Sequence, residues 1–200
     1  MKEQSEFSEF IVIGVFALML FSSIYLVIFD IPGELIVKYV STITSGNIVL
    51  LVVLSYSIGV LTSRTLQMLD YEFFKSLIGN FFIKKVFSKS DIKYIENFNR
   101  EEWVKNEILV QQYGSESVVN RIGYQHSLMR IFKAATILLP ITAIFASIWV
   151  NNNFGIGNSA FFTTSLLLCA FLSFKSHRNV KKSEIWLVSE VSRILEEKNK

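Results

Sequence analysis

Long uncharged apolar windows alternate with short charged segments along this chain. The longest window, residues 134–174, runs for 41 residues without Asp, Glu, Lys, Arg or His. One bilayer crossing needs about 20 apolar residues, so this window is long enough for two. Its middle, residues 151–155, holds three asparagines and a glycine. The pattern predicts a helical hairpin through a membrane.

Two further uncharged windows, residues 10–29 and 39–63, lie upstream. Together the windows predict four transmembrane helices, at residues 10–29, 43–63, 134–150 and 159–175. A secretory signal peptide is the alternative for the first window, but such peptides begin with basic residues. This chain instead places Glu3, Glu6 and Glu9 before its first apolar run. We therefore expect an uncleaved span.

The segments between the spans carry helical patterns. Apolar residues at helical spacing predict that the second span continues past Arg64; these are Leu66, Leu69, Phe73, Phe74 and Leu77. Short helices are expected over residues 81–112, with Asn99 as an N-cap and Gly114 as a helix stop. A long helix then runs from Glu116 into the third span, with a bend at Pro140. Trp103 and Trp186 are expected to fill a small core.

The predicted fold class is all-α: a polytopic membrane protein with four transmembrane helices and a helical cytoplasmic subdomain formed by helix extensions. The chain divides into four parts by this pattern. They are a transmembrane hairpin (1–64), a cytoplasmic helical segment (65–133), a second transmembrane hairpin (134–175) and an amphipathic C-terminal helix (176–200).

Composition agrees with membrane insertion. Hydrophobic residues make up 51% of the chain and charged residues 18%, whereas soluble domains are about a quarter charged. The net charge is only +3, but 11 of the 20 Lys and Arg lie within residues 64–133 and seven lie after residue 174. Because basic segments stay in the cytoplasm, we expect the N- and C-termini and the central segment to be cytoplasmic.

Small residues recur on single faces of the spans. Ser55, Gly59 and Ser63 are spaced four residues apart, and Ala143 with Ser147 repeats the spacing. Close backbone approach at small residues is a main source of contact between helices in lipid. Packing within the chain is the favoured interpretation of both sets, and contact in a homo-oligomer is the alternative.

No cluster of residues resembles a catalytic or metal site, and none of the common nucleophile, zinc or phosphate-binding motifs occurs. We therefore expect no enzymatic activity and no cofactor. The predicted spans contain no ionisable acid, Lys or His, which argues against a proton-coupled transporter. A hydroxyl-lined pore stays open as an alternative. Its candidate residues are Thr42, Thr44, Ser45, Asn47, Ser55, Thr136 and Thr142, although such hydroxyls usually bond to their own helix.

Two groups of residues are candidates for surface contacts. Lysines near Phe81 and Phe82 are expected to lie against anionic lipid, and acidic residues that follow them argue against direct nucleic-acid binding; they are Lys84, Lys85, Lys89 and Lys93. The long helix carries candidates for binding a partner protein, or else for ion pairs with neighbouring helices; they are Glu116, Arg121, Tyr124, His126 and Arg130.

The four predicted spans, short external loops and basic central segment resemble the membrane subunit of the Kiwa antiphage system of bacteria. The resemblance extends over the whole chain and rests on architecture. It implies a bacterial inner-membrane protein that forms a homo-oligomer, a tetramer, and senses a membrane event during phage infection. It also implies a cytoplasmic partner subunit that binds nucleic acid.

The leading hypothesis is a membrane sensor or scaffold, embedded in the lipid bilayer, whose cytoplasmic helices recruit a soluble effector protein encoded in the same operon. Long helices that cross the lipid boundary suit this role, because a change in tilt must move their cytoplasmic ends. The alternatives are a pore-forming effector that depolarises the cell and a structural subunit of a transport complex.

Overall fold

The computed structural model describes residues 2–68 and 100–198, and these form helices joined by short turns. The helices are α1 (Lys2–Ile28), α2 (Gly33–Val40), α3 (Ser45–Met68), α7 (Arg100–Tyr113), α8 (Glu116–Phe154) and α9 (Ile156–Lys198). Among the described residues there is no strand, and α1, α3, α8 and α9 are each long and apolar enough to cross a membrane. The all-helical class and the four candidate spans agree with the sequence.

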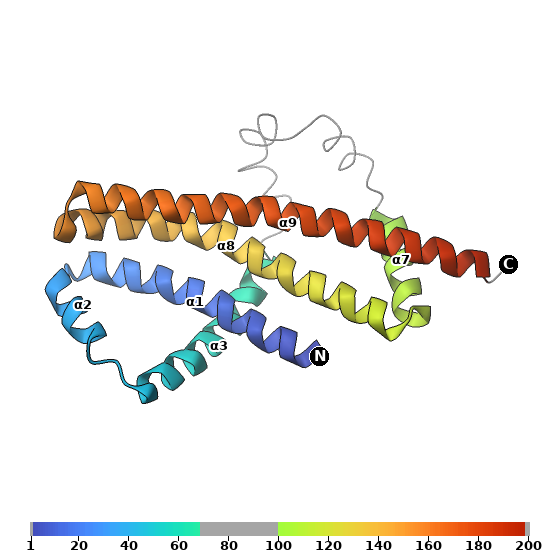
Figure 1. The fold of residues 1–200 in the computed structure, drawn as a ribbon, viewed down its shortest axis with the longest axis horizontal. Helices are drawn as coiled ribbons and strands as arrows, with labels where there is room; N and C mark the ends of the chain where they lie inside the picture. Colours follow the sequence, from blue (N-terminus) through green and yellow to red (C-terminus); the bar gives the residue numbers. More distant parts are fainter. Residues whose placement is uncertain (1, 69–99, 199–200) are drawn as a thin grey trace.

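The four long helices lie side by side in the order α3, α1, α8, α9 (Figure 1). Packing contacts run between neighbours in this row, with α1 and α8 in the middle. Glu9 meets Arg130 near one end of the α1–α8 contact and Ile31 meets Trp149 near the other, so these two helices are parallel. The remaining neighbours are antiparallel, and both termini lie toward the same end.

The apolar core lies on both sides of α8. On the α1 side, Ile13, Ala17, Leu66, Ala134 and Leu138 pack together. On the α9 side the cluster is Ala135, Leu139, Ala143, Leu166 and Ala170. Each cluster takes at least one alanine from α8, namely Ala134 in the first and Ala135 and Ala143 in the second, and small residues allow the helix backbones to approach closely. This packing explains why α8 is the most buried of the four candidate spans.

The turn of the second hairpin is shorter than expected. Residues 151–158 are predicted to separate the spans, but α8 continues to Phe154 and α9 begins at Ile156. Gly155 alone makes the turn, with φ of 85°, a conformation that costs glycine little because it has no Cβ. The asparagines stay helical, and α8 also runs unbroken through Pro140.

The first loop contains a helix that the sequence analysis missed. Proline followed by glycine, as at Pro32 and Gly33, is typical of a turn, yet α2 starts at Gly33 with Pro32 as its N-cap. Glu34 in its first turn and Lys38 in its last turn both suit the helix dipole. These two charged residues therefore favour a short helix in the segment between α1 and α3.

Charged residues gather at the end of the molecule where α7 lies. There the first half of α8 (116–133) and the last half of α9 (175–198) extend beyond the uncharged windows, and α7 packs against both. We call α7 and these two segments the polar end. α7 stops at Tyr113 before Gly114, as predicted, and Ser115 occupies the N-cap position of α8.

Candidate functional site: a titratable cluster at the polar end

A small apolar core holds the three helices of the polar end together. Val110 of α7, Ile122 of α8 and Val188 of α9 are at most 2% exposed and pack on one another. Trp103 and Leu195 cover this core. Each helix contributes residues at helical spacing, so one apolar face of every segment points inward. Polar side chains surround the core and determine the chemistry of this region.

A histidine and two glutamates, one from each helix, meet beside this core. The Nε2 atom of His126 on α8 pairs with Oε1 of Glu184 on α9. It also lies 3.8 Å from Oε1 of Glu107 on α7. The side chain of Glu184 is only 2% exposed, whereas those of Glu107 and His126 are 16% and 33% exposed. One ring nitrogen is thus shared between two carboxylates from different helices.

The cluster lies outside the uncharged windows. His126 precedes Ala134 by eight residues, which is about 12 Å of helix at 1.5 Å per residue. The hydrogen bond to Glu184 raises the pKa of His126 above its ordinary value, and the Glu107 carboxylate adds to this. Burial raises the pKa of Glu107, against the opposing effect of His126. The arrangement therefore binds a proton more tightly than its separate groups do.

Neutral hydrogen bonds flank the titratable cluster. Gln125 Nε2 donates to Ser183 Oγ over 3.0 Å and joins α8 to α9. Ser192 Oγ donates to Asn106 Oδ1 over 3.0 Å and joins α9 to α7. These pairs contain no titratable group, so a change of pH near neutrality does not act on them directly. They also fix the register in which His126 meets Glu184.

A second charged pair joins α1 to α8 where the uncharged windows begin. Glu9 Oε1 lies 2.8 Å from Nε of Arg130, and the Glu9 side chain is fully buried. One turn further along α8, Lys133 Nζ donates to the Leu66 carbonyl of α3 over 2.7 Å. A lysine ammonium carries three donors and can bond a backbone carbonyl of a neighbouring helix in this way. α8 is therefore tied to both helices of the first hairpin.

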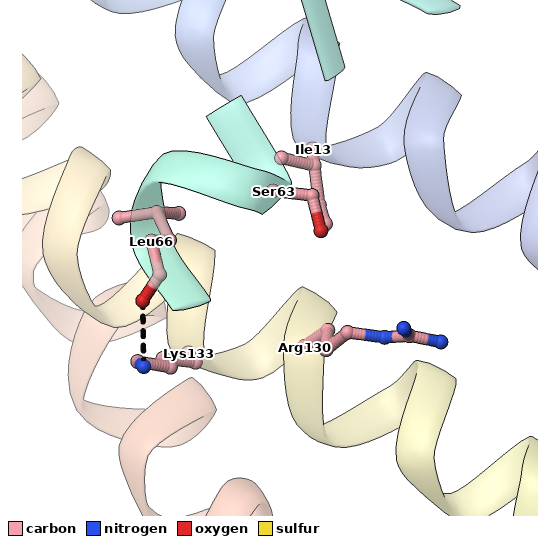
Figure 2. A pocket seen from close by; sticks show the side chains of 5 residues that line it. All are labelled: Ile13, Ser63, Leu66, Arg130 and Lys133. Atoms are coloured by element: carbon pink, nitrogen blue, oxygen red, sulfur yellow. Dashed lines mark hydrogen bonds between the residues drawn. The ribbon is translucent and has the colours of Figure 1, made fainter. Parts of the chain in front are cut away.

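A small cavity of about 10 Å³ lies between these contacts. Ile13, Ser63 and Leu66 line it together with Arg130 and Lys133. Figure 2 shows the side chains of Arg130 and Lys133 extending in opposite directions, with Lys133 toward Leu66. The space suffices for about one water molecule. Its walls are mostly apolar carbon, so it is a gap in packing rather than a binding site.

The structure places the first set of predicted packing residues against α1. Ser55, Gly59 and Ser63 are buried. A Cβ atom on Gly59 would lie 1.7 Å from the Phe10 carbonyl oxygen, and one on Gly14 of α1 would lie 1.6 Å from the Ser55 carbonyl oxygen. The two helices thus cross with their backbones in contact, which the missing side chains permit.

The second set lies in the other hairpin. Ala143 is 1% exposed and packs in the α8–α9 cluster. The Ser147 carbonyl accepts a hydrogen bond of 2.8 Å from Ser159 Oγ on α9. All five small residues therefore serve contacts within the chain.

The predicted partner-binding residues of α8 fall into two groups. Glu116, Arg121 and Tyr124 are exposed, whereas His126 and Arg130 are engaged in the pairs described above. The expectation for Trp186 is wrong: it is 65% exposed, while Trp103 covers the small core. The lysines predicted to contact lipid, Lys84, Lys85, Lys89 and Lys93, lie outside the described residues.

Several hydroxyls considered for a pore bond back to their own helices. Thr136 Oγ1 donates to Phe132 O over 2.7 Å and Thr142 Oγ1 to Leu138 O over 2.8 Å. Thr42 Oγ1 donates to Tyr39 O over 2.8 Å just after α2. In residues 2–68 and 100–198 no group of three His, Cys, Asp or Glu is arranged to hold a metal ion.

Comparison with protein families, with curated proteins and with solved structures gave no match. The contacts of the chain itself must therefore carry any conclusion about function. Three important acids, Glu9, Glu107 and Glu184, are not among the site residues predicted from sequence. A signal existed for Glu9, since it is the last charge before the first span and Arg130 precedes the third span on the same side.

Proposed function

We propose that this protein is a non-enzymatic membrane scaffold or sensor whose cytoplasmic end recruits a soluble effector protein. One observation carries the proposal: α8 and α9 are continuous helices of 39 and 43 residues. A bilayer core about 30 Å thick takes only about 20 residues of each. The rest of both helices forms the polar end, so a rotation or shift of the spans reaches α7 without passing through a flexible joint.

Charge supports a cytoplasmic location of the polar end. All three segments of the polar end carry basic residues, whereas the opposite end carries only Lys38. An excess of Lys and Arg on one side orients a membrane protein with that side in the cytoplasm. Both termini lie toward the polar end in Figure 1 and share this proposed side.

Exposed aromatic residues mark the proposed partner surface. Tyr113, Tyr124 and Trp186 are 64%, 56% and 65% exposed, although each lies on a helix of the polar end. Large amphipathic rings beside charges are typical of residues that dominate protein interfaces. Glu116 and Arg121 lie near Tyr124 on α8 and supply charges for the rim. This combination favours a protein partner over a lipid surface.

The resemblance to the Kiwa membrane subunit makes the proposal more specific. It names the partner as a nucleic-acid-binding subunit of an antiphage system in the bacterial inner membrane, and it assigns a homo-tetramer to the membrane protein. The oligomer would have to use surfaces other than the five small residues above, since four of them are buried and the Ser147 carbonyl is bonded to Ser159 of α9. Copurification from a host that carries the native operon tests this narrower form.

Site-specific crosslinking tests the scaffold itself. A photoreactive amino acid replaces Tyr124, and the matched control replaces Tyr25, which is 55% exposed but lies within α1. We expect the Tyr124 position to capture one soluble protein in native cells and the Tyr25 position to capture none. Failure to capture any protein at Tyr124, together with ion conductance of the purified chain in liposomes, would favour the pore instead.

A further inference from the structure

The attachment of α7 combines a titratable contact with uncharged ones. Val110 and Trp103 hold α7 by apolar packing, and Asn106 by a neutral hydrogen bond. Glu107 of α7 also faces His126 across 3.8 Å. Of these contacts, the one with His126 changes its charge near neutral pH, because imidazole is the side chain that titrates there.

The charges around His126 come from all three helices. Glu184 on α9 pairs with it directly, Glu107 on α7 lies beyond, and Arg130 lies one turn along α8. A protonated His126 is a cation between two carboxylates. After it loses the proton, Glu107 and Glu184 face each other with no charge between them. Glu184 is 2% exposed, so water does little to screen the repulsion.

We propose that α7 is a pH-controlled arm, docked on the α8–α9 hairpin by protonated His126 and released when His126 becomes neutral. The neutral pair of Gln125 with Ser183 keeps α8 and α9 together in both states. Release therefore moves α7 alone and uncovers the core residues Val110, Ile122 and Val188. Acidification of the cytoplasm closes the arm, and an alkaline shift opens it.

Docking of α7 and proton binding by His126 are thermodynamically linked, so the raised pKa of His126 determines whether docking strengthens or weakens with pH. The pKa of His126 is raised in the docked state, so docking gains stability at pH values below the ordinary pKa of histidine, about 6.5. That stability is lost as the pH rises through the raised pKa of the docked state. The raised pKa of Glu107 acts in the same direction at lower pH. Each pKa unit of difference between the docked and released states changes the docking equilibrium about tenfold.

The experiment measures the distance between two spin labels on the full chain in lipid nanodiscs. The labels occupy cysteines at Lys105 of α7 and Ser189 of α9, both exposed, in a Cys169→Ser background that removes the single native cysteine. We expect one narrow distance distribution at about pH 6 and a broad one at about pH 9. A distribution that stays narrow across this range would overturn the proposal.

Three variants assign the transition to its residue. His126→Gln should give the broad distribution at every pH, and Glu107→Gln should keep α7 docked at high pH because the repulsion is gone. The chain has two histidines, so His177→Gln is the matched control and should leave the midpoint unchanged. A transition that survives in His126→Gln, or disappears in His177→Gln, contradicts the assignment. The readout concerns α7 alone, so failure here leaves the scaffold proposal standing, and the reverse also holds.

Discussion

The two ends of the α1–α8 contact are held by different kinds of interaction. At the polar end, the buried Glu9 carboxylate pairs with Arg130 at 2.8 Å. At the opposite end, Trp149 Nε1 donates to the Ile31 carbonyl over 2.7 Å, and the Gly33 amide donates to Asn153 Oδ1 over 2.7 Å. The two hydrogen bonds at this opposite end join only neutral groups, and two of those groups belong to the backbone.

This difference separates what each end can do. Neutral bonds to backbone groups are insensitive to pH and set a fixed distance between the α1–α2 turn and the end of α8. Charged pairs at the polar end depend on protonation and on the presence of both partners, because a buried charge without its partner is costly. The contacts at the opposite end thus do not depend on protonation, whereas those at the polar end do.

The largest effect on the free energy of unfolding is expected at the Glu9–Arg130 ion pair. Arg130→Ala leaves the fully buried Glu9 without its cation, which should lower the free energy of unfolding by about 3–5 kcal/mol. Chemical unfolding of the purified chain in micelles, followed by circular dichroism, measures this loss. Adding Glu9→Gln to the same variant removes the orphaned charge and should restore much of the stability. Equal stability of Arg130→Ala and the native chain would show that the pair does not stabilise the contact between α1 and α8.

A smaller effect is expected where α1 crosses α3 near the same end. In Gly59→Ala the new Cβ would lie 1.7 Å from the Phe10 carbonyl oxygen, so the two backbones must separate. Overpacking of this kind costs about 1–3 kcal/mol in the same unfolding measurement. Gly123→Ala on α8 is the matched control, because no atom lies within 4 Å of its Cβ position. The control should be neutral or gain up to about 1 kcal/mol; a loss as large as that of Gly59→Ala would contradict a steric cause.

Much of the helical framework could be predicted because its signals are local. Uncharged windows of spanning length mark α1, α3, α8 and α9, and Gly114 with Ser115 marks the α7–α8 junction. α2 was missed because proline followed by glycine is typical of a turn, and only the charges at Glu34 and Lys38 favour a helix. The sequence predicts too broad a hairpin turn because asparagine is favoured in turns, whereas Asn151, Asn152 and Asn153 lie in the last turn of α8.

The contacts between distant helices were harder to predict. Glu9 meets Arg130 only because α1 and α8 are parallel neighbours, and Glu184 meets His126 only in the register of the α8–α9 hairpin. Nothing in the periodicity of a span states which span lies next to it. The exposed side of Trp186 was missed for the same reason, since the position of α7 decides which face of α9 is covered.

The smallest effect on the free energy of unfolding is expected at the neutral hydrogen bond between Trp149 and Ile31. Trp149→Phe keeps an aromatic ring beside Phe154 but removes the hydrogen bond to the Ile31 carbonyl. One such bond contributes about 1 kcal/mol, so the free energy of unfolding should fall by about that amount. No titratable group takes part in this bond, and the loss should therefore be the same at about pH 6 and about pH 9. A loss that grows with pH would show that the two ends are coupled, and the contrast between a pH-independent end and a pH-dependent polar end would not hold.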